Sequence, residues 1–456
     1  MEKRAWIDEM VAVRKDSLPA SVIASIRSDL TIKARAFRGF SEVEVFVENG
    51  EWLWLPRVYG YRRLRALGFK FQDNRASGPD LDAEVDWGIL DQPPHPHDQS
   101  ILVRTAVEKT KKNGFGGFVV AHTGSGKTLM GSYIGALLGG PTLVVVHKSD
   151  LMKNWRESIT NHVRVGGRIP LIGEIRQSRC DYDPRFPFVV GMAQSLALKK
   201  YPKAVYSAFR TIMVDETHHV PCATLLSVVY KFRAKYLLGV TATLRRKDNT
   251  EKVFQLAIGD VLYTMVRGGV DGRVFFAPVP FMIQRSRICV GSTVSLAKMG
   301  VAFAGLRYRN NMIITQVIQA YKDGRKNLVL SHSRPHLANL YKMLPEEIRR
   351  RTGFYVGGRT EAELKEASEK RLLLATYGMA AEGMDVPKID MLTLATPCKD
   401  IEQPVGRILR KHEDKKKPVV LDFVDRHKTL IRWAREGRAP YYRREGFTFM
   451  TDIPVA

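Results

Sequence analysis

The chain has 456 residues, more than a single hydrophobic core usually holds, so we expect two or three domains. Its 72 lysines and arginines outnumber its 47 aspartates and glutamates, and the formal net charge of +25 favours a polyanionic partner, most simply nucleic acid, over an acidic membrane surface. Four scattered cysteines and the absence of any apolar run of about 18 residues exclude a disulfide framework, a zinc site and a membrane-spanning helix. We therefore expect a soluble intracellular protein.

Residues 1–90 are rich in aromatic and basic side chains and carry no nucleotide-binding pattern. Two alternating runs, 43–47 and 51–55, flank Asn49-Gly50, which predicts a β-hairpin. Aromatic and cationic residues are interleaved over 59–65, an arrangement in which rings could stack on bases while cations follow phosphates. We predict a small α+β domain that binds the nucleic-acid substrate. The alternative is that these aromatics only fill a small core.

A glycine loop follows the apolar run 118–120 and precedes a segment of helical spacing over 129–138. Backbone N–H groups and the positive end of the helix dipole meet at such a helix start, which suits a polyphosphate. Lys127 would reach the β- and γ-phosphates and Thr128 would ligate Mg²⁺. The loop itself contains Thr123, Gly124, Ser125 and Gly126, and Ala121 stands where the usual pattern has its first glycine.

Gln99 lies just upstream, beside a segment of helical spacing over 101–111 that follows a proline- and histidine-containing loop. Its amide offers the donors and acceptor that match the N6 and N7 edge of adenine. A surface glutamine without a ligand is the alternative.

The apolar runs 142–146 and 188–191 are typical of strands buried on both faces of a parallel sheet. A third apolar strand begins at Thr211 and ends in two adjacent acids, Asp215 and Glu216. One carboxylate could enter the Mg²⁺ shell while the other orients the attacking water. A further strand, 236–240, runs into Thr241 and Thr243, two hydroxyls that could sense the acid pair.

A second series of strands and helices begins near residue 311 and predicts a second parallel sheet. Its strands are expected at 327–331, 353–356, 371–376 and 391–395, with a helix near 337–344. Arg407 and Arg410 are three residues apart, so on a helix they share a face and could stabilise the charge of a transferring phosphoryl group. Two surface arginines on a basic protein are the alternative.

Taken in order, the runs AHTGSGKT, DETH, TAT and QPVGRILR resemble motifs I, II, III and VI of superfamily 2 helicases of the DExH kind. The run ATYGMAAEGMD, which ends at Asp385, is similar to motif V, and the region 329–337 is similar to motif IV. The resemblance covers about residues 91–445 and favours the branch that contains phage UvsW-like and XPB-like branch-migrating DNA helicases.

The resemblance implies an α/β fold of two RecA-like parallel-sheet domains in tandem, preceded by the small α+β domain. The expected domains are 1–90 for substrate binding, 91–272 as the ATP-binding RecA-like domain, 273–300 as a linker and 301–456 as the second RecA-like domain. ATP would bind between the two RecA-like domains. Asp215 would serve the metal, Glu216 would polarise the water, and Arg407 and Arg410 would complete the site on closure. His218 and Gln403 would couple the domains, Thr241 and Thr243 would link hydrolysis to movement, and Asp385 would contact the ribose or the partner domain.

The function implied by the resemblance is that of an ATP-dependent DNA helicase or translocase acting on forks, D-loops and four-way junctions. An RNA helicase and a restriction-type translocase subunit are the enzymatic alternatives. A nucleic-acid clamp that does not use ATP is the non-enzymatic one. We expect ATP and Mg²⁺ as cofactors, no membrane association, no stable protein partner and a monomer, located in the host cytoplasm if a phage encodes it.

Overall fold

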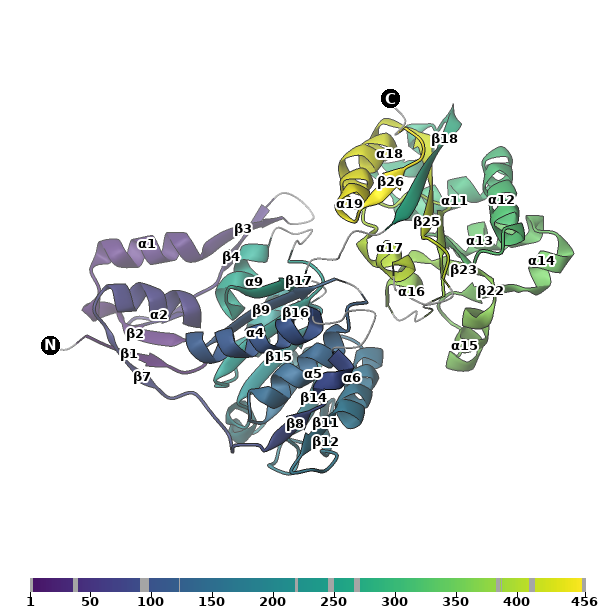
Figure 1. The fold of residues 1–456 in the computed structure, drawn as a ribbon. Coiled ribbons are helices and arrows are strands. Elements are labelled where there is room, and N and C mark those ends of the chain that lie inside the picture. The colour runs from purple at the N-terminus through teal and green to yellow at the C-terminus, as the bar shows by residue number, and fades with distance from the viewer. Residues whose placement is uncertain are drawn as a thin grey trace. The chain divides into compact units, whose positions relative to one another are not determined.

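The computed structural model describes residues 3–35, 40–90, 98–122, 124–217, 220–244, 250–265, 271–382, 386, 388–409 and 415–452. The chain divides into two compact units, Met1–Val266 and Arg267–Ala456. Figure 1 shows the elements of both units. No helix within the described ranges is both long and apolar enough to cross a membrane.

The first unit begins with a five-stranded mixed sheet in the order β5-β6-β2-β1-β7. Its strands are β1 (Arg4–Ile7), β2 (Val11–Arg14), β5 (Val47–Glu48), β6 (Trp52–Leu55) and β7 (Lys70–Asp73). Helices α1 (Ala20–Leu30) and α2 (Arg57–Ala66) pack on it through a shared core that includes Ile26, Leu53 and Leu64, and a separate hairpin is formed by β3 (Thr31–Arg35) and β4 (Phe40–Glu44). The antiparallel β5–β6 pair confirms a hairpin at Asn49-Gly50 and an α+β arrangement. The predicted first strand, 43–47, is wrong in its bounds, because its first residues end β4, which pairs with β3, and only Val47–Glu48 pairs with β6.

Two arginines fasten this α+β part to the rest of the first unit. Arg57, only 2% exposed, donates to the backbone carbonyls of Phe232 and Ala234 at 2.7 and 2.6 Å. Arg75 donates to the carbonyl of Lys235 at 2.8 Å. Burial lowers the pKa of Arg57 to about 9, so the guanidinium remains charged at neutral pH and its carbonyl partners stay engaged.

The main sheet of the first unit has eight strands in the order β13-β12-β14-β10-β15-β16-β9-β17. Every neighbouring pair is parallel except β12 with β13, which confirms the predicted parallel-sheet architecture. The strands are β9 (Gly116–Ala121), β10 (Thr142–Val146), β12 (Ile172–Arg176), β13 (Arg179–Cys180), β14 (Phe188–Met192), β15 (Thr211–Asp215), β16 (Tyr236–Thr241) and β17 (Val261–Met265). A short pair of β8 (Ala83–Val85) and β11 (Val163–Val165) lies beside it.

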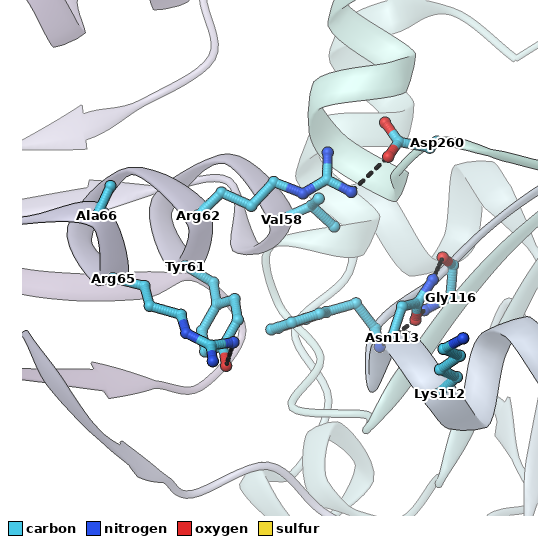
Figure 2. Close-up of a pocket in the computed structure, with 10 residues that line it drawn as sticks. Val58, Tyr61, Arg62, Arg65, Ala66, Lys112, Asn113, Gly116 and Asp260 are labelled. Carbon is cyan, nitrogen blue, oxygen red and sulfur yellow. Dashed lines mark hydrogen bonds and ion pairs between the residues drawn. The ribbon is translucent and has the colours of Figure 1, made fainter.

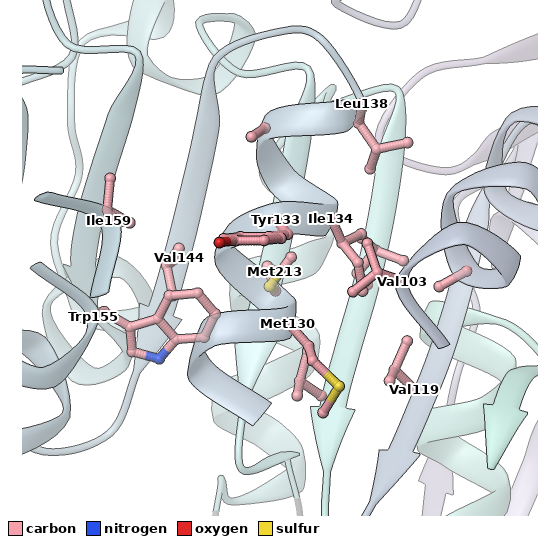
Figure 3. Close-up of a cluster of buried hydrophobic side chains, with 14 of the residues drawn as sticks. Val103, Val119, Met130, Tyr133, Ile134, Leu138, Val144, Trp155, Ile159 and Met213 are labelled. Carbon is pink, nitrogen blue, oxygen red and sulfur yellow. The ribbon is translucent and has the colours of Figure 1, made fainter. Parts of the chain in front are cut away.

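Successive residues along each strand enter two different cores, because side chains alternate between the faces of a sheet. In β10, Val144 and Val146 join the core under α4 (Asp98–Asn113), α5 (Lys127–Leu137) and α6 (Ser149–His162), which Figure 3 shows in part. Leu143 and Val145 join the core on the other face, under α7 (Ala193–Leu198), α8 (Cys222–Val229) and α9 (Glu251–Ile258). Burial on both faces explains why these strands read as continuous apolar runs.

The second unit is built on a seven-stranded, all-parallel sheet in the order β22-β23-β21-β24-β25-β18-β26. Its strands are β18 (Gly272–Met282), β21 (Asn327–Ser331), β22 (Thr352–Tyr355), β23 (Leu372–Thr376), β24 (Met391–Leu394), β25 (Val419–Arg426) and β26 (Phe447–Phe449). One face is covered by α12 (Arg307–Lys322), α13 (Arg334–Met343) and α14 (Glu346–Arg350). The other is covered by α16 (Tyr377–Glu382), α17 (Glu402–Ile408), α18 (Lys428–Arg432) and α19 (Ala439–Arg444).

Strand β18 differs from expectation, because the segment 273–300 was expected to be a linker. Its first part instead forms this long strand, which pairs with β25 and β26. The strand contains Pro278 and Pro280, residues that usually mark edge strands or non-strand segments, and most of its later positions are exposed. The rest of the segment contributes α10 (Arg285–Ile288), the β19–β20 pair (Cys289–Val290, Thr293–Val294) and most of α11 (Leu296–Ala304).

Candidate nucleotide-binding site

The glycine loop lies at the carboxyl edge of the eight-stranded sheet, between the end of β9 and the start of α5. Gly124 and Gly126 have φ values of 82° and 80°, a left-handed conformation that glycine adopts without a steric cost. Helix α5 begins directly after Gly126, so its first N–H groups face the loop. Thr128 stands in the first turn, and the Ser125 hydroxyl is buried without a hydrogen-bond partner among the described residues.

Gln99 lies against this loop. Its amide nitrogen donates to the backbone carbonyl of Ser125 at 2.7 Å, and the residue is only 8% exposed. A Cβ on Gly126 would come within 2.7 Å of the same nitrogen, so any larger residue at Gly126 would displace the amide. In this structure Gln99 therefore braces the loop from α4, and its expected role toward adenine stays a prediction.

Asp215 ends β15 and Glu216 follows it, two strands away from β9 in the sheet order. Lys127 reaches across to Glu216, with 3.4 Å between Nζ and Oε1. Glu216 has a φ of 47°, unusual for a residue with a side chain, and this backbone conformation holds it at the end of the strand. The structure thus brings together three of the predicted site residues, Lys127, Asp215 and Glu216.

Asp215 is buried and held at both carboxylate oxygens. Its Oδ1 accepts a hydrogen bond from the backbone N–H of Glu216 at 2.9 Å, and its Oδ2 accepts one from the indole N–H of Trp155 at 2.7 Å. Burial, and then the charge of Glu216, raises the pKa of Asp215 well above its usual range, while Trp155 and Lys127 oppose that shift. A cation that approaches this carboxylate would therefore favour its ionised form.

The sequence patterns predicted no role for Trp155. It is fully buried in α6, and Figure 3 shows its ring beside α5. A Cβ on Gly131 of α5 would lie 2.4 Å from the ring, so the close approach of the two helices requires glycine there. A lone tryptophan in a helix after a buried strand is an ambiguous signal, because packing alone explains most such residues.

Thr241 ends β16, the strand between β15 and β9, and Val240 beside it is the register partner of Asp215. Its hydroxyl donates to the carbonyl of Thr243 at 2.7 Å and so closes a tight turn. Thr241 is fully buried, and the strand register places it beside the end of β15, where the acid pair lies.

In the second unit, Gln403 and Arg407 lie four residues apart on α17 and share a face of that helix. The start of α17 is held by α19, since Arg444 pairs with Glu402 at 2.8 Å. Behind these helices, Arg438 and Asp422 form a fully buried ion pair at 2.7 Å. Asp422, inside β25, was not anticipated, because charged residues are uncommon inside a buried strand. Thr123, His218, Asp385 and Arg410 were also predicted for the site and lie outside the described residues.

The residues present fit a magnesium nucleotide. The loop offers backbone N–H groups at a helix start for phosphate, and Lys127 supplies a cation beside them. A buried carboxylate and a hydroxyl, from Asp215 and Thr128, are the hard oxygen donors that Mg²⁺ prefers. The unpartnered Ser125 hydroxyl adds a polar group that a phosphate oxygen could satisfy.

Comparison with known proteins agrees with this chemistry. Residues 93–246 match the family model described as "Type III restriction enzyme, res subunit". This match and the ordered motifs make the chain similar to the helicases of superfamily 2 and support an ATP-dependent helicase.

Among individual proteins, the chain is similar to the "Putative ATP-dependent RNA helicase L396" of Acanthamoeba polyphaga mimivirus, with 28% identity over 95% of this chain and 84% of the relative. It is 25% identical to the "DNA 3'-5' translocase XPB2" of Sulfurisphaera tokodaii over 50% of each chain. Among solved structures, the helicase domain of Pyrococcus furiosus Hef shares the fold, with 12% identity, a TM-score of 0.50 and coverage of 78% of this chain and all of that one. T4 UvsW aligns over 99% of both chains with 17% identity and a TM-score of 0.42.

Proposed function

We propose that this chain is a monomeric ATP-dependent DNA translocase that unwinds or branch-migrates forked and recombination-intermediate DNA. The observation that carries the proposal is the convergence of Lys127, Asp215 and Glu216 at one edge of a parallel sheet. The second unit supplies a helix with Gln403 and Arg407 on one face. The net charge of +25 favours binding to the polyanionic backbone of nucleic acid.

The ion pair of Lys127 with Glu216 suggests how ATP would engage the site. A γ-phosphate attracts Lys127 more strongly than one carboxylate does, so its arrival would release Glu216. The freed Glu216 would then orient the attacking water, while Thr128 and Asp215 would hold Mg²⁺. When bound, Mg²⁺ supplies positive charge that neutralises the phosphates.

Arg407, with Arg410, would complete this site when the second unit closes on the nucleotide. Guanidinium groups that arrive only on closure make hydrolysis depend on movement of the units. Thr241 and Thr243, beside the acid pair, would transmit the state of the nucleotide to the nucleic-acid strand. Alternating closure and opening would then move the protein along that strand.

A second candidate is an RNA helicase, because the mimivirus relative is named as one. The XPB2 relative is named as a DNA translocase, and the proposal for DNA rests on that resemblance. The discriminating test is ATP hydrolysis by the wild-type chain with DNA and RNA oligonucleotides of the same sequence, with Lys127→Ala as the inactive control. Stimulation by DNA well above that by RNA supports the proposal. Stimulation by RNA alone would replace it with the second candidate.

A further inference from the structure

The first unit also has an open hollow away from the glycine loop. It has a volume of about 530 Å³ and lies between α2, the end of α4, the start of β9 and Asp260. Figure 2 shows Arg62 and Arg65 entering it from α2 and Lys112 from α4. We call this hollow the α2–α4 notch.

The notch is positively charged. Its lining holds the three cations Arg62, Arg65 and Lys112 and a single carboxylate, that of Asp260. Helix α2 contributes four arginines and no acid, although residues 1–90 as a whole carry as many acidic as basic side chains. Two of these arginines, Arg62 and Arg65, line the notch, whereas Arg57 is buried against the backbone carbonyls of Phe232 and Ala234.

One of these cations, Arg65, is supported by an aromatic ring. Arg65 donates to the hydroxyl of Tyr61 at 3.1 Å and lies over its ring, 5.7 Å from the centroid. Tyr61 packs in turn against Phe115, with 5.0 Å between ring centroids. The wall beneath is fixed by Asn113, whose side-chain amide bonds the backbone of Phe115 and Gly116. Arg65 is thus held by Tyr61 while the residue remains exposed.

One ion pair crosses the notch, between Arg62 and Asp260, as Figure 2 shows. Both side chains are more than 60% exposed, so the pair is weak and a phosphate can replace the carboxylate. The removal of Asp260 would leave all three cations for an anionic ligand.

The notch is separate from the nucleotide site. Gly116 begins β9 and lines the notch, whereas the glycine loop follows Ala121 at the other end of that strand. At about 3.3 Å per residue the two sites are roughly 17 Å apart along β9. The notch lies at the amino end of this strand and the glycine loop at its carboxyl end. The open, exposed cations also differ from the enclosed, mostly apolar pockets that hold small ligands.

We propose that the α2–α4 notch binds the phosphodiester backbone of a second arm of the nucleic-acid substrate, distinct from the strand on which the motor moves. This inference rests on the proposed function and deepens it, since a protein that acts on branched DNA must hold more than one arm. Arg65 and Lys112 contact phosphates, Arg62 exchanges Asp260 for a phosphate, and Tyr61 supports the contact from below.

The test compares two double variants of the full chain. Arg65→Gln with Lys112→Gln removes two notch cations, and Arg168→Gln with Arg176→Gln removes two exposed cations near the other edge of the same sheet. Affinity is measured by fluorescence anisotropy for a labelled fork and for its single-stranded tail alone, over a range of salt concentrations. All four side chains are exposed, so both variants should fold, and their melting temperatures verify this.

We expect the notch variant to bind the fork about tenfold more weakly and its salt slope to fall by about two, since each lost phosphate contact lowers the slope by about 0.9. Tail affinity and tail-stimulated hydrolysis should equal those of wild type and control. Asp260→Asn should bind the fork more tightly than wild type, a gain that a structural role for Asp260 would not produce.

Equal fork affinity in the two double variants would overturn the proposal. An equal loss of affinity for the single-stranded tail in the notch variant would also overturn it, because that loss indicates a general weakening of DNA binding. So would a notch that binds inorganic phosphate or a mononucleotide while the notch variant keeps wild-type affinity for the fork. The proposed function fails by a different result: wild-type chain that hydrolyses no ATP with any nucleic acid. The two failures are therefore distinguishable.

Discussion

The indole N–H of Trp155 on α6 donates a 2.7 Å hydrogen bond to the carboxylate of Asp215 at the end of β15. Both residues are buried, and the second oxygen of Asp215 is held by the backbone of Glu216. The orientation of the proposed metal ligand is therefore set by a helix on the neighbouring α-layer. Groups that orient a ligand in this way commonly change metal affinity by about 10- to 100-fold when they are removed.

The first prediction concerns this bond. Trp155→Phe keeps an aromatic ring in the core but removes the donor, so Asp215 loses its fixed orientation. We expect the free Mg²⁺ concentration needed for half-maximal ATP hydrolysis to rise about tenfold. Nucleotide binding measured without Mg²⁺ should stay unchanged. Trp52→Phe, in the N-terminal sheet, is the matched control. An unaltered Mg²⁺ requirement in Trp155→Phe would show that the bond serves packing only.

The second prediction separates binding from hydrolysis in the Lys127–Glu216 pair. Lys127→Ala removes the cation for phosphate and should abolish both ATP binding and stimulated hydrolysis. Glu216→Gln keeps the shape of the side chain but cannot polarise water, so hydrolysis should fall by about 10²- to 10⁴-fold while ATP still binds. DNA affinity should stay near wild type in both. Glu216→Gln with wild-type turnover would remove Glu216 from the mechanism.

The third prediction concerns the buried pair behind α17. Arg438 and Asp422 are both fully buried, and the Tyr442 hydroxyl also donates to Asp422. Arg438→Met leaves a buried carboxylate uncompensated and should destabilise the second unit by about 3 to 5 kcal/mol. Adding Asp422→Leu should restore most of that stability, because the double variant no longer buries an unpaired carboxylate. Urea denaturation of the two variants checks this, and equal midpoints for single and double variants would contradict it.

The fourth prediction is a pH dependence. His336 is buried between the Ser331 hydroxyl and the Asn310 amide, at 3.0 and 2.9 Å, and burial followed by the charge of Arg309 lowers its pKa to about 3. The unfolded chain binds this proton near pH 6.5, so the full contribution of His336 is present above pH 6.5 and is lost as the pH falls toward 3.

At pH 5 this proton linkage lowers the free energy of unfolding by about 2 kcal/mol relative to pH 7. His336→Gln should therefore reduce the acid sensitivity of the second unit, whatever it does to stability at pH 7. His332 titrates in the same direction and should leave part of the sensitivity in place. Thermal denaturation at pH 5, 6 and 7 measures the slope, and identical slopes in wild type and His336→Gln would refute the assignment.

Sequence patterns predicted the fold well where burial on both faces leaves continuous apolar runs, as in β10, β15 and β21. They failed at β18, because its prolines and exposed positions hide a strand that is defined by pairing with β25. The site was predictable in its motif residues, since glycine loops and paired acids carry local signals. The contacts of Trp155 and Gln99 were not, because each depends on how a helix packs against a strand or loop distant in sequence.

The central claim is that ATP hydrolysis at the Lys127–Glu216 site drives separation of DNA strands at a branch point. The most direct measurement is release of a labelled strand from forks, D-loops and four-way junctions, with wild type and Lys127→Ala compared at equal DNA occupancy. We expect ATP-dependent release by wild type from at least one branched substrate and none by Lys127→Ala. Wild-type protein that binds every substrate and hydrolyses ATP, yet releases no strand and moves no branch, would contradict the account.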